Sequence, residues 1–251
     1  MSAADLDAAA EAVQLARQTV DRAVARLAAS GDMDASQVVA YDVAHAAAAV
    51  ESAAAVLDYG RRGEEEGALA AAFVADAVHD VLSRSLGREE DWGGGDAGGH
   101  EAVLPFRRRH RHPDFVAGLA DRPGPRHLDP DFELVQDTFR RFAEDRIRPV
   151  AEHVHRTNSD IPEDVIAGLG EMGAFGLSVP EEYGGFASGG EHDYMGMVVA
   201  TEELSRGSLG VGGSLITRPE ILTRALVRGG TEEQKRYWLP RIATGETMVA
   251  V

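Results

Sequence analysis

Small apolar residues at helical spacing are the feature that most constrains the first 92 residues of this chain. They recur every three or four positions through residues 5–27, 36–59 and 64–86, and many of them are alanine. Glycine follows the second and third of these segments, at Gly60 and Gly87, where it is typical of a helix end. Because alanine lets helix backbones approach closely, the pattern predicts a helical bundle over residues 1–92.

Residues 93–127 differ in composition from the segment before them. Residues 93–99 are rich in glycine, and residues 107–112 are a run of arginine and histidine, so we expect a linker over 93–127. The basic run has two interpretations: a solvated segment resting on acidic surface nearby, which is the commoner case, or a patch that binds phosphate groups or a neighbouring subunit. A metal site at His110 and His112 is disfavoured, because the adjacent arginines repel a cation.

The net charge of −17 narrows the classes of partner. A chain this acidic repels nucleic acid phosphates and anionic membrane surfaces, so neither is expected as a partner. The lack of cysteine excludes disulfides, thiolate catalysis and Cys-ligated metals, and it fits a cytoplasmic location. The first residues show no signal-peptide pattern, and no apolar run reaches the roughly 18 residues of a membrane span.

Residues 128–246 return to a helical pattern. Asp129 and Pro130 suit the cap and first turn of a helix whose apolar stripe extends to Ile147. Further helices are predicted over residues 162–172, 191–206, 209–228 and 231–243. Residues 247–251 are apolar and rich in β-branched side chains, which predicts the start of a strand. The expected fold is therefore all-α, with this strand at its end.

Three motifs in this part are similar to motifs of one known family. Residues 173–185 read GAFGLSVPEEYGG, residues 201–206 read TEELSR, and residues 230–246 contain GTEEQK, WLP and GE in that order. In order and spacing they resemble the N-terminal helical domain of flavin-dependent acyl-CoA dehydrogenases. The resemblance covers the second half of the chain, from about residue 126.

The resemblance implies an enzyme that oxidises an acyl-CoA to the α,β-enoyl-CoA with FAD as cofactor. It also implies electron-transfer flavoprotein as the electron acceptor and a homo-oligomeric assembly. In that family the strand predicted at 247–251 continues into a β-domain, and the glutamate base that removes the α-proton would lie beyond Val251. We therefore expect this chain to be part of a longer enzyme and inactive alone, with no catalytic residue and no metal ligand of its own.

Two features resemble one branch of the family, which oxidises (2S)-methylsuccinyl-CoA to mesaconyl-CoA. These are the helical extension over residues 1–92 and the segment from Leu204 to Arg218. Two alternatives stay open. One is a dehydrogenase for another short branched-chain acyl-CoA, and the other is a non-catalytic helical interaction protein that keeps only this domain.

Candidate substrate contacts follow from the resemblance. A methylsuccinyl group ends in a carboxylate, which needs a cation when buried, and an arginine fork matches it. Arg218 is the first candidate for this contact and Arg206 the second. Gly213 either leaves room for the acyl chain or allows close helix packing. Ser214 and Thr217 either donate to the substrate or bond to their own helix backbone.

Two further positions concern the cofactor. Val249 and Val251 lie on the predicted strand whose continuation meets the flavin in this family. We expect their backbone groups, rather than their side chains, to contact FAD.

Overall fold

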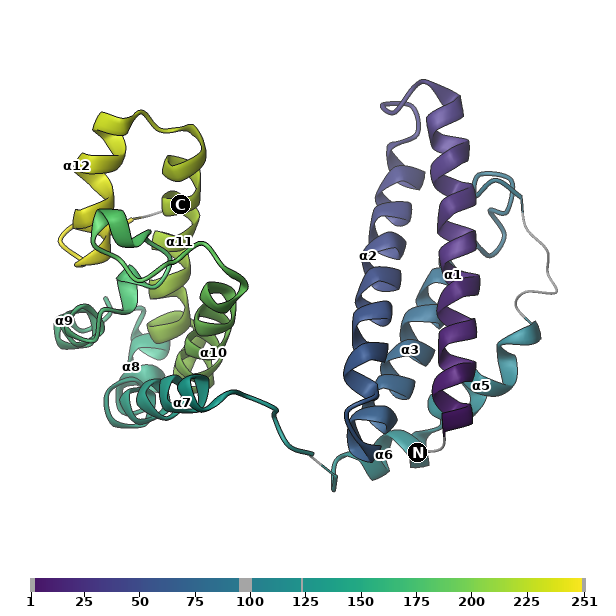
Figure 1. Cartoon of the computed structure of the whole chain (residues 1–251), viewed down its shortest axis with the longest axis horizontal. Coiled ribbons are helices and arrows are strands. Elements are labelled where there is room, and N and C mark those ends of the chain that lie inside the picture. Colours follow the sequence, from purple (N-terminus) through teal and green to yellow (C-terminus); the bar gives the residue numbers. More distant parts are fainter. Residues whose placement is uncertain (1–2, 95–100, 123, 250–251) are drawn as a thin grey trace. The chain divides into compact units, whose positions relative to one another are not determined.

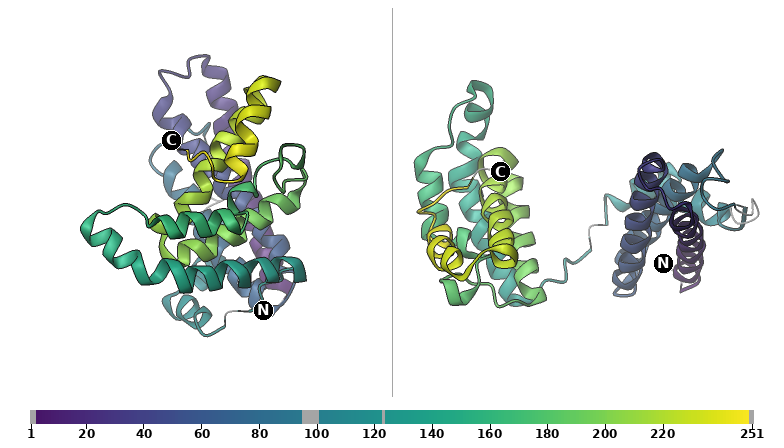
Figure 2. Two further views of the ribbon diagram at one scale, coloured as in Figure 1. Left: turned by 90° about the vertical axis from the view of Figure 1, so that its left-hand side faces the viewer. Right: turned by 90° about the horizontal axis from the view of Figure 1, so that it is seen from above.

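The computed structural model describes residues 3–94, 101–122 and 124–249. The chain divides into two compact units, unit 1 (Met1–Arg126) and unit 2 (His127–Val251), shown in Figures 1 and 2. Within the described ranges every regular element is helical, and the strand-like pairing is limited to an isolated bridge between Pro180 and Ala187. The all-α fold class is therefore confirmed. None of the helices described here is long and apolar enough to span a bilayer.

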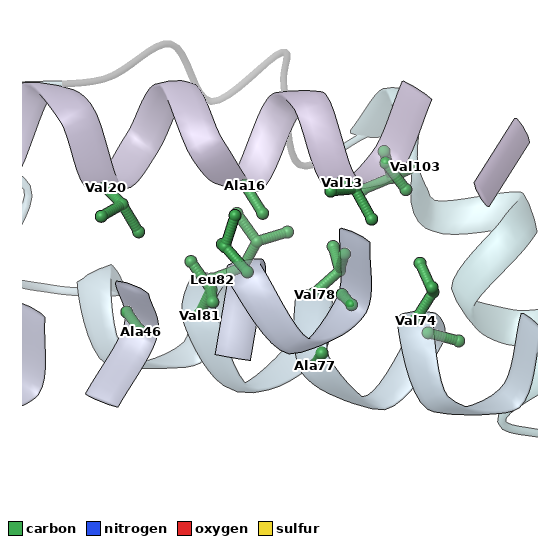
Figure 3. Close-up of a cluster of buried hydrophobic side chains, with 14 of the residues drawn as sticks. Val13, Ala16, Val20, Ala46, Val74, Ala77, Val78, Val81, Leu82 and Val103 are labelled. Atoms are coloured by element: carbon green, nitrogen blue, oxygen red, sulfur yellow. The ribbon is translucent and has the colours of Figure 1, made fainter. Parts of the chain in front are cut away.

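Unit 1 is built on three long helices at the predicted positions: α1 (Ala3–Ser30), α2 (Gln37–Gly60) and α3 (Glu64–Ser85). Each of them contacts the other two. Figure 3 shows the side chains that fill the space between them, and most are alanine or valine. Small side chains bring the helices close together, so that even a narrow apolar stripe on each helix is fully removed from water.

The end of α2 shows how close this packing is. A Cβ atom added to Gly60 would lie 2.6 Å from the Cβ of Ala70 on α3, which is shorter than real Cβ contacts. Gly60 is the last residue of α2 and is buried. Glycine is therefore required here by the approach of a neighbouring helix, in addition to its tendency to end a helix.

The prediction of a linker over residues 93–127 is wrong for two segments that fold as short helices. These are α5 (Leu104–His110) and α6 (Pro113–Leu119), each with proline in its first turn, where a missing N–H leaves no helix bond unmade. α5 contacts α1 and α3, and α6 contacts α3. Phe106 of α5 joins the same core as Trp92, so apolar burial holds the segment to the bundle. Residues 95–100 and residue 123 of the predicted linker lie outside the described residues.

Unit 2 contains the helices predicted from the sequence. α7 (Pro130–Phe142) continues through a π-helical turn (Ala143–Ile147) into α8 (Arg148–Thr157). A second π-helical turn (Leu209–Gly213) joins the two longest helices of the unit. The helices that follow α8 are α9 (Glu163–Glu171), α10 (Glu191–Ser208), α11 (Ser214–Gly229) and α12 (Glu232–Ala243).

α10 is the central helix of unit 2. It contacts α7, α8, α11 and both π-helical turns. Its side chains Met197, Ala200 and Leu204 are buried in one cluster with Phe139 and Ile147. α12 begins with a capping box, in which Thr231 and Gln234 satisfy each other's backbone N–H groups, as the sequence Thr-Glu-Glu-Gln predicts.

The strand predicted at residues 247–251 is not formed in the part of it that the structure describes. Residues 247–249 adopt neither helix nor strand, and residues 250–251, including Val251, lie outside the described residues. A strand needs a neighbouring strand to take its backbone hydrogen bonds, and the described part of the chain offers none. The N–H of Thr247 donates instead to the carbonyl of Arg241, and Val249 is half-buried beside Leu239.

We predict that enlarging a buried alanine of α2 destabilises unit 1. Ala53 is 1% exposed, so Ala53→Leu should force neighbouring helices apart and lower the free energy of unfolding by about 1–3 kcal/mol. Ala55→Leu, at an exposed position on the same helix, should change it little. Urea unfolding in a Trp238→Phe background measures this, because the buried Trp92 then reports on unit 1 alone. Equal losses in the two variants would contradict the packing described above.

Candidate functional site at the turn between two long helices

The predicted substrate contacts surround the π-helical turn Leu209–Gly213, which joins α10 to α11. Ser208 caps this turn, since its Oγ accepts a hydrogen bond from the N–H of Val211 at 3.2 Å. Val211 and the two glycines after it are buried, whereas Leu209 and Gly210 are exposed. The turn therefore has one face against the core of unit 2 and one face open to water.

The buried glycines of the turn are in close contact with neighbouring helices. A Cβ on Gly212 would lie 2.5 Å from Cδ1 of Ile147 and 3.0 Å from the carbonyl oxygen of Leu204. A Cβ on Gly213 would overlap the hydroxyl of Ser205. Of the two interpretations of Gly213, close packing accounts for the contacts in the described residues, and its contact with a substrate stays a prediction.

The two hydroxyl residues after the turn bond to their own helix. Ser214 Oγ donates to the carbonyl of Gly210 at 3.0 Å, and Thr217 Oγ1 donates to the carbonyl of Ser214 at 3.3 Å. Such bonds are the common state of Ser and Thr in helices. A substrate would have to compete with these backbone acceptors, because each hydroxyl has only one hydrogen to donate.

The two candidate arginines differ in their surroundings. Arg218 is exposed and makes no hydrogen bond or ion pair with the residues that the structure describes. Arg206 donates from Nε to Glu203 at 2.8 Å and from Nη1 to Glu144 at 2.6 Å. Arg218 is thus free to bind an added carboxylate, whereas Arg206 already bridges two carboxylates of the protein.

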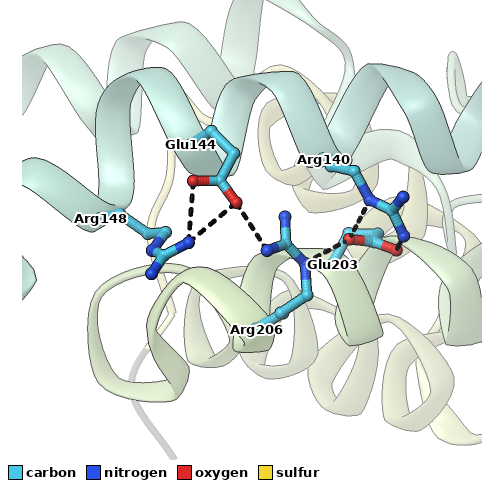
Figure 4. A network of polar contacts seen from close by, with 5 residues as sticks. All are labelled: Arg140, Glu144, Arg148, Glu203 and Arg206. Atoms are coloured by element: carbon cyan, nitrogen blue, oxygen red, sulfur yellow. Dashed lines mark hydrogen bonds and ion pairs between the residues drawn. The ribbon is translucent and has the colours of Figure 1, made fainter.

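Glu203 is the centre of the ionic network drawn in Figure 4. Its side chain is fully buried, and Arg140 of α7 binds both of its oxygens, at 2.7 and 3.1 Å. Arg206 binds one of the same oxygens and continues the network to Glu144, which Arg148 also holds. The network therefore ties α10 to α7, α8 and the turn between them.

The electrostatics of Glu203 follow from this geometry. The hydrogen bond from Arg140 is the main cause that lowers its pKa, and Arg206 adds to it, so that the pKa falls to about 2 although burial opposes the shift. Glu203 is therefore ionised throughout the physiological range. It cannot serve as a proton-accepting base, since two guanidinium groups already occupy its oxygens.

The sequence pattern did not reveal the burial of Glu203. Adjacent residues on a helix, such as Glu202 and Glu203, point in directions about 100° apart, so the pair itself does not show which carboxylate is buried. The position of Glu203 in the sequence could have indicated its burial. Glu203 lies three residues after Ala200 and next to Leu204, which places it on the apolar face of α10. An acidic residue on such a face requires a cation from a neighbouring helix.

A cleft of about 680 Å³ lies elsewhere in unit 2, between residues 177–190 and the helices α10 and α11. None of the predicted site residues that the structure describes lines it. Asp193, on its wall, is held by hydrogen bonds from Ser188 and Gly189; burial alone would raise its pKa, but these bonds lower it. The other lining side chains include Leu177, Met197, Thr223, Arg224, Val227 and Arg228.

Comparison with known proteins assigns unit 2. A family model described as acyl-CoA dehydrogenase, N-terminal domain, matches residues 129–246. Residues 129–246 form an acyl-CoA dehydrogenase N-terminal domain. The helices α7 to α12, both π-helical turns and the Glu203 network (Figure 4) all lie within this domain.

Curated relatives match about half of the chain. (2S)-Methylsuccinyl-CoA dehydrogenase of Cereibacter sphaeroides is 47% identical over 121 residues, which is 48% of this chain and 21% of the relative. Mitochondrial isovaleryl-CoA dehydrogenase of Solanum tuberosum is 34% identical over 57% of this chain and 33% of the relative. The enzyme of the same name from Arabidopsis thaliana is 37% identical over 46% of this chain and 28% of the relative. The chain thus spans about a fifth to a third of these relatives.

We predict that Glu203→Gln destabilises the dehydrogenase domain in a pH-dependent way. The folded pKa of Glu203 lies below its ordinary value of 4.5, so the stabilisation is complete above pH 4.5 and is lost as pH falls towards 2. At neutral pH the free energy of unfolding of the variant should be lower than that of wild type by up to about 3 kcal/mol. This is an upper value because Arg140 and Arg206 are partly exposed to water.

Urea unfolding followed by Trp238 fluorescence, with Trp92 replaced by Phe in both proteins, measures this difference across pH. The difference in free energy of unfolding between wild type and Glu203→Gln should decrease steadily from pH 5 to the acid limit of the experiment. A gap that stays constant with pH would show that the ionised carboxylate does not supply the stabilisation.

We predict that Gly212→Ala destabilises the turn of the dehydrogenase domain by about 1–3 kcal/mol, because the methyl group would meet the carbonyl of Leu204, which cannot move aside. Gly210→Ala provides a matched control in the same turn. Nothing lies within 4 Å of its added Cβ, so that variant should be neutral or slightly more stable. Thermal unfolding of both variants tests this, and similar midpoints would contradict the close packing at Gly212.

Proposed function

We propose that this chain serves in an FAD-dependent acyl-CoA dehydrogenase that oxidises (2S)-methylsuccinyl-CoA to mesaconyl-CoA. The observation that carries this proposal is the 47% identity to a (2S)-methylsuccinyl-CoA dehydrogenase over 121 residues. Two isovaleryl-CoA dehydrogenases are 34% identical over 146 residues and 37% identical over 118 residues. In this reading the domain forms one wall of the acyl pocket. The buried turn with Gly212 and Gly213 gives that wall a fixed shape.

The wall would select its substrate by charge. The distal carboxylate of a methylsuccinyl group needs a cation once water is excluded, and an unpaired arginine can supply two parallel hydrogen bonds. Arg218 follows the turn by one helical turn and has no carboxylate partner among the described residues. Arg218 therefore binds the distal carboxylate in this proposal, while Arg206 holds the network behind the wall.

The resemblance to acyl-CoA dehydrogenases supports the cofactor and the partners in this proposal. FAD, when bound, supplies the acceptor for the hydride that leaves the β-carbon, and Val249 and Val251 contribute backbone contacts to it. Glu203 and Glu144 are both bound by arginines, so neither serves as the base that removes the α-proton, which the resemblance to the family puts in another part of the enzyme. Electron-transfer flavoprotein accepts the electrons, and the enzyme works as a homo-oligomer in the cytoplasm.

A second candidate function is oxidation of another short branched-chain acyl-CoA. It is favoured by the matches to isovaleryl-CoA dehydrogenases. The two candidates differ at the far end of the acyl chain, which is a carboxylate in one and a methyl group in the other. A cation at the pocket wall is useful only for the first, so the role of Arg218 separates them. A non-catalytic helical protein would show neither activity.

We predict that Arg218→Met, made in the full-length enzyme, selectively impairs use of methylsuccinyl-CoA. Loss of a charge-assisted pair costs about 1.5–3 kcal/mol, so kcat/KM for this substrate should fall about 10- to 100-fold. The value for isovaleryl-CoA, which has no distal charge, should fall less or even rise.

Arg236→Met is the control for this experiment, because Arg236 is likewise exposed on a helix of the same domain. It should leave both values unchanged. Equal losses on the two substrates in Arg218→Met would argue against a contact with the distal carboxylate. A full-length protein with no flavin absorbance and no activity on either substrate would support the non-catalytic alternative.

A further inference from the structure

The basic run at residues 107–112 has no part in the proposed function, and the structure places much of it against α3. Arg107 of α5 and Arg111, four residues later, lie on the same face of the segment. Arg107 Nη2 lies 2.5 Å from Nδ1 of His79, and Arg111 Nε lies 2.6 Å from Oδ1 of Asp76. Two guanidinium groups therefore meet two neighbouring side chains of one helix.

Arg107 is half-buried and yet has no carboxylate partner among the residues that the structure describes. Other arginines of unit 1 either pair with an acidic side chain or, like Arg22 and Arg108, are exposed. Arg107 donates to a histidine instead, and its Nε is buried with no hydrogen-bond partner in the described residues. The paired arginines are Arg17, Arg61, Arg84, Arg88, Arg109, Arg111 and Arg122.

The charge around Arg107 is unbalanced. His79 accepts at Nδ1 and is therefore neutral, and burial together with Arg111 and Arg107 lowers its pKa. Asp80, the next acidic residue on α3, is held by Arg84 at 2.8 Å. Two full positive charges thus face Asp76, whose side chain is 72% exposed. A locally cationic, partly desolvated cluster in a chain of net charge −17 is a site that an added anion would stabilise.

We propose that Arg107 and Arg111, together with His79, bind a phosphate group. A guanidinium presents a planar fork of N–H donors that matches the oxygens of a phosphate, and two forks can hold a dianion that a single carboxylate would not balance. Arg107 donates to His79 from Nη2, and Arg111 donates to Asp76 from Nε. Among the described residues the Nη groups of Arg111 have no acceptor, so they can donate to a phosphate oxygen. Free phosphate and a phosphate ester share this chemistry.

Isothermal titration calorimetry of the whole chain tests the site with inorganic phosphate, adenosine 3′,5′-bisphosphate and CoA, each at matched ionic strength in potassium chloride. Wild type should bind at least one of these probes, and Arg107→Gln should bind it about 10- to 100-fold more weakly. Binding of all three with similar affinity would indicate free phosphate as the ligand. A preference for the bisphosphate and CoA would indicate an ester.

Arg108→Gln is the matched control, since it removes the same charge from the adjacent, exposed residue of α5. It should bind within about twofold of wild type. Equal weakening in Arg107→Gln and Arg108→Gln, or no binding by wild type, would overturn the proposal. Circular dichroism confirms folding, and if Arg107→Gln does not fold, Arg111→Gln should show the same loss. The site belongs to unit 1, so its failure leaves the dehydrogenase assignment unaffected.

Discussion

A fully buried carboxylate at the centre of unit 2 has to be neutralised before its helix can join a core. Glu203 meets this requirement through Arg140, which reaches it from α7 with two hydrogen bonds, and through Arg206 on the next turn of α10. Taking these charges out of water costs several kcal/mol, which is offset only by good hydrogen-bond geometry. We therefore interpret the pair as fixing how α10 lies along α7, because any other register would leave Glu203 buried without a cation.

Close backbone approach is the second constraint, and the two units meet it differently. Unit 1 uses alanine along the whole length of its helices, so the contact is continuous. The dehydrogenase domain uses glycine at single crossing points. Gly207 and Gly212 both lie against the π-helical turn that contains Ile147. A Cβ on Gly207 would lie 3.1 Å from the Cβ of Ala143 and 3.2 Å from Cγ2 of Ile147, and a Cβ on Gly212 would lie 2.5 Å from Cδ1 of Ile147. The close approach of this turn to α10 and to the turn after α10 thus accounts for both glycines.

The sequence was sufficient for the features that depend on local periodicity. The predicted segments 36–59 and 64–86 match α2 and α3 to within a residue, since apolar spacing and glycine both mark the ends. The sequence was not sufficient where contacts with other elements determine the local structure. α5 has too few apolar positions to reveal a helix, although Phe106 anchors it, and residues 247–249 have strand propensity but no strand to pair with.

The candidate site divides in the same way. The backbone bonds of Ser214 and Thr217 follow from residue type alone and could be expected. The pairing of Arg206 could not, because it depends on knowing that α7 and its π-helical turn lie beside α10 and bring Glu144 within reach.

The different states of the two arginines favour Arg218 over Arg206 for the proposed contact with a substrate carboxylate. Arg206 would have to release Glu203 or Glu144 to bind an added carboxylate, and releasing Glu203 removes one of the two cations that hold a buried charge. The energy gained from the substrate would be offset by that loss. Arg218 gives up only water, so its full hydrogen-bonding capacity is available to a ligand.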